Sequence, residues 1–390
     1  MAKASPYYNA GVFNLVLGAQ AGNPAPAIRI HNASANHDAM TFGPYLASEV
    51  NNFANNEELF GSLFAESEMH NTAGGFMYRN YTNLLNSSRP VPASIYEVNL
   101  HTTFGSISQD VLNAFAPSLG AGLAVVDHML MIMRNLQMTE QCLYSATGYR
   151  NTRTDGKTVL LWGSVRDCGV TDRKRPQYLA CQLANRALAG DMVATTNTGD
   201  NPTWSVTNLN RVTYTNAHFL RSYAFRNGGS RSLIVFNLHR TDPLTADFAG
   251  PLAPTGRVTV QQLTSTNITA NNESSNVVAI TTQVMANFNP VQAFVLPACS
   301  MTLLQWTTAP PHIVAIDVDH LGGAVRIDWD ADVGRLYLVR FSPTLTNWAD
   351  AGLPRTASNT LMTYTDDGSE TGGYPPLLAT QRFYHVILLP

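Results

Sequence analysis

The residues best suited to chemistry lie in one short segment, Ile95-Tyr96-Glu97-Val98-Asn99-Leu100-His101. Alternate side chains of a β-strand point to the same face of its sheet, so a strand here places Glu97, Asn99 and His101 together. In a closed barrel of parallel strands, the carboxyl ends of the strands carry the active site. A carboxylate there, beside an amide and an imidazole, could attack the anomeric carbon of a sugar. The alternative is that Glu97 forms a core ion pair or faces solvent.

Other catalytic signatures are absent from the sequence. It contains no G-x-S-x-G and no S-x-x-K motif. Gly156-Lys157-Thr158 resembles the end of a phosphate loop, but residue 151 is Asn and the segment follows a hairpin turn. His31 and His37 could ligate a metal, although a surface or turn role is favoured. The four cysteines form no CxxC pair. We therefore expect neither a cofactor nor a metal site.

Strands and helices alternate over residues 1–200, which predicts βα units and parallel pairing. The apolar period of 108–137 indicates a helix that Pro117 splits in two, and Gly74-Gly75 breaks an earlier helical stretch over 46–85. A last helix begins near Pro176 and ends at Gly190. The strands expected in this region are 13–18, 37–45, 93–100, 141–146 and, after the Asp155-Gly156 turn, 158–162.

The pattern changes near residue 200, after which only strands separated by turns are expected. The predicted fold class is α/β plus all-β, with a partial (β/α)8-type barrel of about four βα units followed by two β-sandwiches. The expected domains are a partial barrel over 1–200, an antiparallel sandwich over 201–308 and a small sandwich over 312–390. Thr308-Ala309-Pro310-Pro311 has the composition of a linker.

The composition excludes some classes of function. Charged residues make up 13% of the 390 residues, the formal net charge is -3, and only three lysines occur, at Lys3, Lys157 and Lys174. A nucleic-acid binder needs several clustered cations, so nucleic acid is not an expected partner. No apolar run approaches the roughly 20 residues of a membrane span. The N-terminus also lacks the apolar region of a secretion signal.

Five segments follow one another along the chain in an order typical of one known architecture. They are TFGPYL (41–46), IYEVNLHTT (95–103), CLYSATGY (142–149) with the later Trp162, LPACSMTLLQW (296–306) and YLVRFSPTLTNWADAG (337–352). Over residues 12–200 the chain resembles the later half of a (β/α)8 barrel from retaining glycoside hydrolases of the GH-A clan, and it is most similar to arabinofuranosidases and xylosidases with an accompanying β-sandwich. The first three segments resemble the sixth strand, the seventh strand and the eighth-strand region, and 296–306 resembles the closing strands of the sandwich. The segment 337–352 resembles an accessory module of secreted bacterial proteins.

The resemblance implies a glycosidase acting on plant-type polysaccharide or oligosaccharide, secreted by or displayed on a bacterium. It makes Glu97 the nucleophile of a retaining mechanism. It makes Tyr45, Asn99, His101 and Trp162 contacts to the sugar, because aromatic faces pack against sugar C–H surfaces. Ordinary core packing is the alternative for Tyr45 and Trp162.

The sequence departs from this family in its second carboxyl group. A retaining mechanism uses two carboxyls about 5–5.5 Å apart. The family's general acid is a Glu at the end of the fourth strand, and no room for that strand exists before Phe13. Glu66 or Glu68, in FAESEMH, is a candidate acid/base, with a solvated helix face as the alternative. A non-catalytic carbohydrate-binding or surface-attachment protein derived from such a hydrolase is the second functional hypothesis.

An incomplete barrel also leaves open strand edges, which invite pairing. A homodimer or higher oligomer could complete the barrel, or the β-sandwich could cover an open sheet. A third possibility is that the chain is a piece of a longer enzyme. An open or dimer-completed half barrel is favoured.

Overall fold

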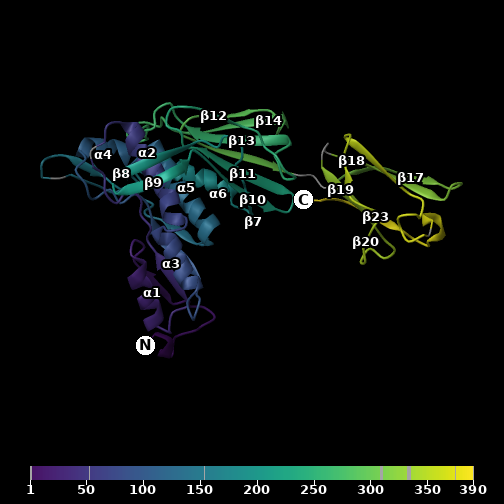
Figure 1. The fold of residues 1–390 in the computed structure, drawn as a ribbon, viewed down its shortest axis with the longest axis horizontal. Helices are drawn as coiled ribbons and strands as arrows, with labels where there is room; N and C mark the ends of the chain where they lie inside the picture. Colours follow the sequence, from purple (N-terminus) through teal and green to yellow (C-terminus); the bar gives the residue numbers. More distant parts are fainter. Residues whose placement is uncertain are drawn as a thin grey trace.

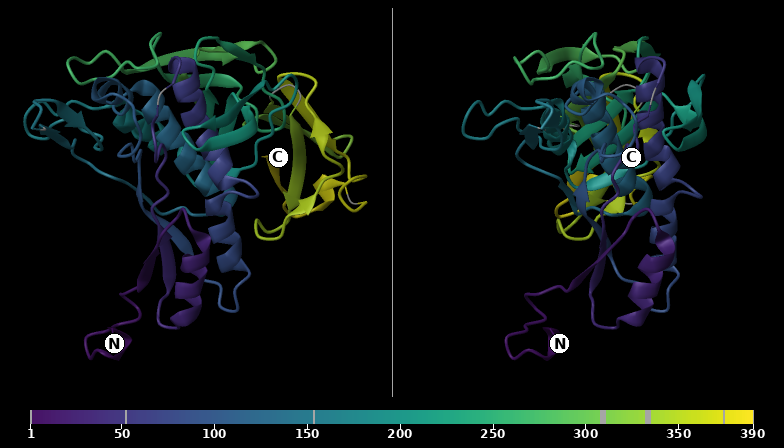
Figure 2. Two further views of the ribbon diagram at one scale, coloured as in Figure 1. Left: turned by 60° about the vertical axis from the view of Figure 1, so that its left-hand side comes forward. Right: turned by 90° about the vertical axis from the view of Figure 1, so that its left-hand side faces the viewer.

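The computed structural model describes residues 2–51, 53–152, 154–307, 311–331, 335–373 and 375–389. Most of the linker expected over 308–311 therefore lies outside the described residues. The fold is mixed α/β, and three groups of elements stand out in Figure 1. Helices α1 and α3 project away from a central body that contains a large sheet, and the C-terminal strands form a separate lobe (Figures 1 and 2).

The first group is a parallel sheet in the order β1-β2-β3-β4, which confirms the expected parallel pairing. Its strands are β1 (Val16–Ala19), β2 (Ala39–Phe42), β3 (Ala93–Val98) and β4 (Gln141–Leu143). One face packs Met40, Phe42 and Val98 against apolar side chains of α1 (Pro24–Ala33), α3 (Phe76–Leu85) and α5 (Leu119–Leu136). The opposite face carries Val16, Tyr96 and Tyr144, which are 50%, 49% and 41% exposed. Among the described residues, helices thus cover the parallel sheet on one side only.

Local sequence signals fix the ends of the helices. The Asn55 side chain accepts a hydrogen bond from the Glu58 amide (3.0 Å) and caps α2 (Asn56–Asn71), whose first turn is acidic. The Gly74-Gly75 break separates α2 from α3, as expected, and Gly74 has a φ of +91° that favours glycine. Pro117 separates α4 (Gln109–Phe115) from α5, and α6 (Pro176–Ala187) begins at its proline.

The second group is a six-stranded antiparallel sheet in the order β14-β13-β16-β11-β10-β7. One face packs on helices α2, α5 and α6, and the other is covered by the two-stranded ribbon of β12 and β15. The second layer expected for a sandwich over 201–308 is therefore mostly helical. The sheet strands are β7 (Asp191–Val193), β10 (Leu220–Asn227), β11 (Ser230–Asn237), β13 (Gly256–Thr264), β14 (Ile280–Phe288) and β16 (Ser300–Thr307), and the ribbon is β12 (Leu244–Ala246) with β15 (Phe294–Leu296).

Two hairpins and a short helix complete the first 220 residues. The hairpin of β5 (Arg150–Thr152) and β6 (Thr158–Leu160) contains the expected Asp155-Gly156 turn. The hairpin of β8 (Thr203–Leu209) and β9 (Val212–His218) packs along α2. The chain starts with the 3-10 helix η1 (Ala2–Ala4).

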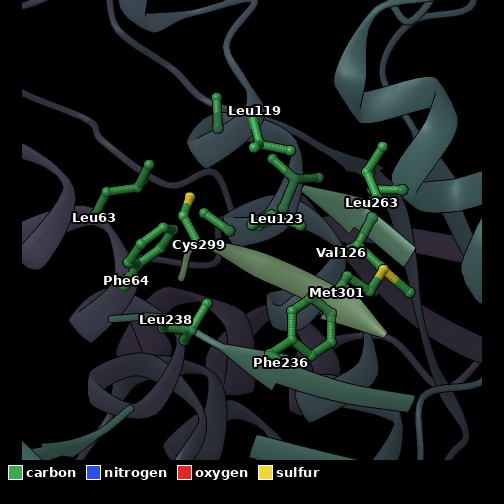
Figure 3. Close-up of a cluster of buried hydrophobic side chains, with 14 of the residues drawn as sticks. Leu63, Phe64, Leu119, Leu123, Val126, Phe236, Leu238, Leu263, Cys299 and Met301 are labelled. Carbon is green, nitrogen blue, oxygen red and sulfur yellow. The ribbon is translucent and has the colours of Figure 1, made fainter. Parts of the chain in front are cut away.

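Helix α5 lies at the centre of the main core, where Leu123 and Val126 meet Phe236 and Met301 of the six-stranded sheet (Figure 3). This helix is long and apolar enough to cross a membrane by length and composition, with a mean hydropathy of 1.2. However, 78% of this 18-residue stretch is buried inside the protein, so the apolar side chains of the helix pack in the core. The elements before and after residue 200 share this one core.

The C-terminal lobe has its own core around Trp329, Tyr337 and Tyr364. One sheet has the order β17-β18-β22, and in the other β19 pairs with β20, β21 and β23. Its elements are β17 (Ile313–Asp319), β18 (Ala324–Asp330), β19 (Leu336–Ser342), β20 (Ala349–Asp350), β21 (Arg355–Thr356), β22 (Leu361–Asp366), the 3-10 helix η2 (Pro376–Leu378) and β23 (Phe383–Leu388).

A buried ion pair joins α5 to the six-stranded sheet. The Arg221 guanidinium on β10 donates to the Asp127 carboxylate on α5, and both side chains are almost fully buried. The Tyr223 hydroxyl also donates to Asp127 (2.8 Å), and Arg221 donates to the Phe64 carbonyl (2.9 Å). Removing one member of a buried pair leaves the other charge without compensation, which is strongly destabilising.

We therefore expect Asp127→Asn to lower the free energy of unfolding by about 3–5 kcal/mol. The double variant Asp127→Leu/Arg221→Met should cost less than this single change, because it removes both charges of the pair and leaves Glu68 with its His218 partner. Denaturant unfolding measures both. Asp191→Asn, at the exposed pair with Arg226, is the control and should change stability by less than about 1 kcal/mol. A double variant as unstable as Asp127→Asn would contradict this explanation.

Candidate functional site

A local irregularity in β3 turns the Glu97 side chain toward the face of the parallel sheet opposite the helices, which we call the open face. The register between β3 and β4 shifts between Ile95 and Val98, so both of these side chains enter the core. Tyr96 and Glu97 lie between them and gather over Gly43, where an added Cβ would stand 3.0 Å from the Tyr96 hydroxyl oxygen and 3.3 Å from Glu97 Cγ. The small residue at position 43 leaves room for this close approach.

Two tyrosines face the Glu97 carboxylate. Burial raises the pKa of Tyr45 and that of Tyr96, and the nearby negative charge and hydrogen bonding of Glu97 raise both further. Both phenols therefore keep their protons at neutral pH and can donate to the carboxylate. Glu97 itself is half-buried. The result is a carboxylate held by hydroxyl donors at the edge of an open sheet.

Aromatic rings extend this site across the carboxyl ends of the strands. The rings of Tyr45 and His101 meet edge-on with centroids 5.8 Å apart. The Trp162 ring lies 5.5 Å from that of Tyr144 and 5.9 Å from that of Tyr149. Tyr144 and Tyr149 are both partly exposed. The structure thus brings Tyr45, His101 and Trp162 to the region of Glu97, and their roles as sugar contacts stay a prediction.

Tyr96, Tyr144 and Tyr149 are not among the site residues expected from the sequence. Two of them could have been predicted from the CLYSATGY segment, in which Tyr144 directly follows β4 and Tyr149 directly precedes β5. Strand alternation assigns Tyr96 to the face opposite Glu97. The irregularity in β3 brings it to the same face.

Asn99 does not share the face of Glu97. Its side chain is only 2% exposed, because it donates to the Tyr144 carbonyl and accepts from the Leu100 amide (2.7 Å). These bonds hold the end of β3 against the end of β4. The regular alternation of side chains expected from the sequence ends at the irregularity in β3. Asn99 therefore supports the backbone at the ends of β3 and β4 and is not exposed on the open face.

Glu66 and Glu68 lie on α2, where they are 5% and 8% exposed, so neither occupies a solvated helix face. Glu66 accepts from the Ala47 amide (2.8 Å) and lies 3.4 Å from His70. Glu68 accepts from His218 (2.9 Å) and lies 3.5 Å from Arg221. Both carboxylates are engaged by partners other than Glu97.

The loop that carries Tyr45 is held from behind by buried polar groups of the helices. His128 on α5 contacts the Pro44 carbonyl (3.1 Å), and Glu66 binds the Ala47 amide two residues beyond Tyr45. Ala47 has a φ of +49°, an uncommon conformation for a residue with a Cβ. The second ring nitrogen of His128 contacts Asn71 (2.9 Å). These contacts fix the direction in which Tyr45 faces Glu97.

His31 and His37 are not on a surface turn. Both are buried, their ring nitrogens are 2.8 Å apart, and Arg89 contacts His37 (3.0 Å). Burial and the charge of Arg89 lower the pKa of both imidazoles. Among the described residues no group of three His, Cys, Asp or Glu side chains could hold a metal ion.

Two cavities lie away from Glu97. One, of about 680 Å³, is lined by Met129, Met133 and Cys181 between α5 and α6. The other, of about 570 Å³, lies between the start of α6 and the strands β13 and β14. Glu97 and its tyrosines instead occupy the uncovered face of the parallel sheet. The candidate site is therefore marked by a carboxylate and its aromatic neighbours on this face, away from both cavities.

Comparisons with known proteins give a likeness in fold. No family model matches the chain, and no curated protein matches it. Among solved structures, the fold is similar to that of an α-L-arabinofuranosidase from Thermotoga maritima, with a TM-score of 0.56 and 16% identity over 77% of this chain and 58% of that chain. A GH51 arabinofuranosidase from Xanthomonas axonopodis pv. citri has a TM-score of 0.53 at 13% identity, over 76% of this chain and 59% of that chain. The match therefore spans about three-fifths of the length of these two enzymes, and it shows that this chain is similar to them in fold.

The buried His128 makes stability depend on pH. Burial and nearby positive charge, from His70 and Arg221, lower the pKa of His128 to about 3, against 6.5 for an ordinary imidazole. The unfolded chain therefore binds a proton that the folded chain does not, and folding weakens as the pH falls below about 6.5. We expect a loss of ~2 kcal/mol from this residue between about pH 7.5 and about pH 5.

Denaturant unfolding over this pH range measures the effect. His128→Asn should have a flatter profile than the wild type and lower stability at neutral pH. Parallel profiles for the two proteins would show that His128 contributes nothing to the pH dependence.

Proposed function

We propose that this protein acts on carbohydrate as a retaining glycoside hydrolase, with Glu97 as the nucleophile. The observation that carries the proposal is a half-buried carboxylate on an open sheet face, held by tyrosine hydroxyls and flanked by exposed aromatic rings. The fold likeness to α-L-arabinofuranosidases supports it. Arabinofuranosides and related plant-type saccharides are the proposed substrates.

In this mechanism Glu97 attacks the anomeric carbon, and the bond from that carbon to the leaving oxygen breaks as the glycosyl–Glu97 ester forms. The leaving oxygen takes a proton from a carboxylic acid. That group, now a carboxylate, then removes a proton from water, which attacks the anomeric carbon and breaks its bond to the Glu97 oxygen, so that Glu97 leaves as a carboxylate. Tyr45 and Tyr96 orient the nucleophile by donating to it. His101 and Trp162, joined by Tyr144 and Tyr149, form the apolar wall for the sugar.

This mechanism also needs a carboxylic acid, other than Glu97, that donates a proton to the leaving oxygen. Glu66 and Glu68 are the carboxyls that the sequence offers, but their contacts support other roles. Glu66 holds the Tyr45 loop, and Glu68 joins α2 to β9 and β10. We therefore propose that the four parallel strands are half of a barrel, and that a second half, in a dimer of this chain, provides the missing carboxyl. The free outer edges of β1 and β4 support this arrangement.

A non-catalytic carbohydrate-binding protein is the second candidate function. The observation that favours it is that Glu66 and Glu68, the other candidate carboxyls, are buried with internal partners. Such a protein would use the same aromatic wall and retain saccharides without cleaving them. The secreted or surface-bound location and bacterial source proposed from the sequence are compatible with either function.

Glu97→Gln should lower kcat/KM on nitrophenyl α-L-arabinofuranoside and β-D-xyloside by about 10³-fold or more, because the amide cannot form the covalent ester. Release of nitrophenol measures this, and light scattering on the same samples gives the oligomeric state. Glu140→Gln is the matched control, since Glu140 is exposed and precedes β4 at the opposite end of the strands.

Equal turnover by Glu97→Gln and the wild type would remove Glu97 from the mechanism. Retardation of both proteins in gels containing arabinan or xylan, without turnover by either, would favour the binding protein.

A further inference from the structure

We propose that Glu273 of the six-stranded sheet region is a positioning residue for the saccharide-binding wall, acting through Arg175 on Trp162. Glu273 lies between β13 and β14, about 100 residues in sequence from the segment it would control. The inference rests on the proposed function, because it assigns Trp162 to the binding wall. It gives the six-stranded sheet a part in ligand binding without contact with the ligand.

Arg175 connects Glu273 to the backbone of Trp162. Its side chain, 1% exposed, precedes α6, and its Nε donates to the Glu273 carboxylate (2.6 Å). Its Nη1 lies within hydrogen-bonding distance of three successive carbonyls, those of Leu161 and Trp162 (both 2.8 Å) and of Gly163 (3.1 Å). A planar guanidinium in a dry environment holds such partners in a fixed geometry. One buried cation therefore connects the carboxylate to the backbone that carries Trp162.

The backbone around Trp162 has little freedom to move. The Trp162 carbonyl also accepts from the Tyr149 amide (3.0 Å), and the Leu161 amide donates to the Tyr149 carbonyl (3.1 Å). Gly163 has a φ of +101° and packs against the backbone of Thr147, where a Cβ would collide. The indole Nε1 donates to the Leu100 carbonyl (2.8 Å), directly after the end of β3. The direction of the indole ring is thus set by the backbone that Arg175 binds.

Glu273 is itself held firmly at this junction. Its amide donates to Asn271 (3.1 Å), and its carbonyl accepts from Arg173. The neighbouring Asn272 donates to the Lys174 carbonyl (2.8 Å), and Arg166 lies 3.5 Å from the second carboxylate oxygen of Glu273. The loop between β13 and β14 is therefore docked on the chain just before α6. These hydrogen bonds fix the position of the Glu273 carboxylate next to Arg175.

Loss of the carboxylate should act on Trp162 and leave Glu97 in place. Without it, the buried guanidinium has carbonyl partners but no counter-charge, which favours its movement toward water. The carbonyls of residues 161–163 then lose their common donor. Glu97 is held by Tyr45 of the loop after β2 and by Tyr96 of β3. Saccharide binding should therefore weaken more than the chemical step.

The test compares Glu273→Gln with the wild type in the full chain by two measurements. Amide hydrogen exchange over residues 149 and 161–163 reports the segment directly, and kinetics on nitrophenyl α-L-arabinofuranoside and β-D-xyloside, with titration of arabino- and xylo-oligosaccharides, report binding. We expect the rate of amide hydrogen exchange at these residues to rise about tenfold in Glu273→Gln. KM should also rise about tenfold, while kcat should change less than about twofold.

Glu57→Gln is the matched control. Glu57 also pairs with a buried arginine, Arg240, which joins α2 to the six-stranded sheet but stacks on Trp204 (4.7 Å). This variant also removes the carboxylate partner of a buried arginine, although the Glu57 side chain is 46% exposed and that of Glu273 13%. It should leave both exchange at 161–163 and KM unchanged.

The outcomes separate this inference from the proposed function. If the wild type binds and cleaves the saccharides and Glu273→Gln does so with the same KM, or with unchanged exchange at 161–163, Glu273 has no positioning role. An equal fall in kcat and kcat/KM would likewise overturn it. If the wild type neither binds nor cleaves any of the saccharides, the proposed function fails and this inference fails with it, whatever the exchange shows.

Discussion

The structure depends on one constraint: the four parallel strands bury only one of their faces. Parallel sheets usually have both faces covered. Here Met40, Phe42 and Val98 enter a helix-covered core, and the opposite face is left to polar and aromatic side chains. The irregularity in β3 then matters, because it turns both Tyr96 and Glu97 toward that open face. The half-buried Glu97 carboxyl accepts hydrogen bonds there from tyrosine hydroxyls, which satisfy it in place of water.

Two buried arginines connect this face to the rest of the molecule. Arg221 joins β10 to α5, the helix whose His128 supports the Tyr45 loop. Arg175 joins the loop before β14 to the backbone of Trp162. In both cases a carboxylate neutralises the arginine, and one terminal nitrogen of the guanidinium donates to backbone carbonyl oxygen, that of Phe64 for Arg221 and those of residues 161–163 for Arg175. The six-stranded sheet therefore supports two separate parts of the candidate site from a distance.

Features determined by neighbouring residues could be predicted from the sequence. Gly74-Gly75, Pro117 and Asp155-Gly156 mark breaks that the structure contains, and the spacing of strands and helices predicted parallel pairing. Features determined by distant residues could not. The shift in β3 depends on pairing with β4, and the burial of Glu66 and Glu68 depends on the Tyr45 loop and on β9 and β10. The helical cover of the six-stranded sheet could not be predicted because strand patterns do not show which elements pack on them.

The core shared by residues on both sides of position 200 has a consequence for modular exchange. Leu123 and Val126 of α5 need Phe236 and Met301 as neighbours, so recombination near residue 200 would separate two halves of one interior. The C-terminal lobe has its own interior around Trp329, and Arg335 joins it to the central body by donating to the Ala253 carbonyl (2.8 Å). Evolutionary shuffling should therefore preserve the first 307 residues as one inherited unit and replace the C-terminal lobe more freely.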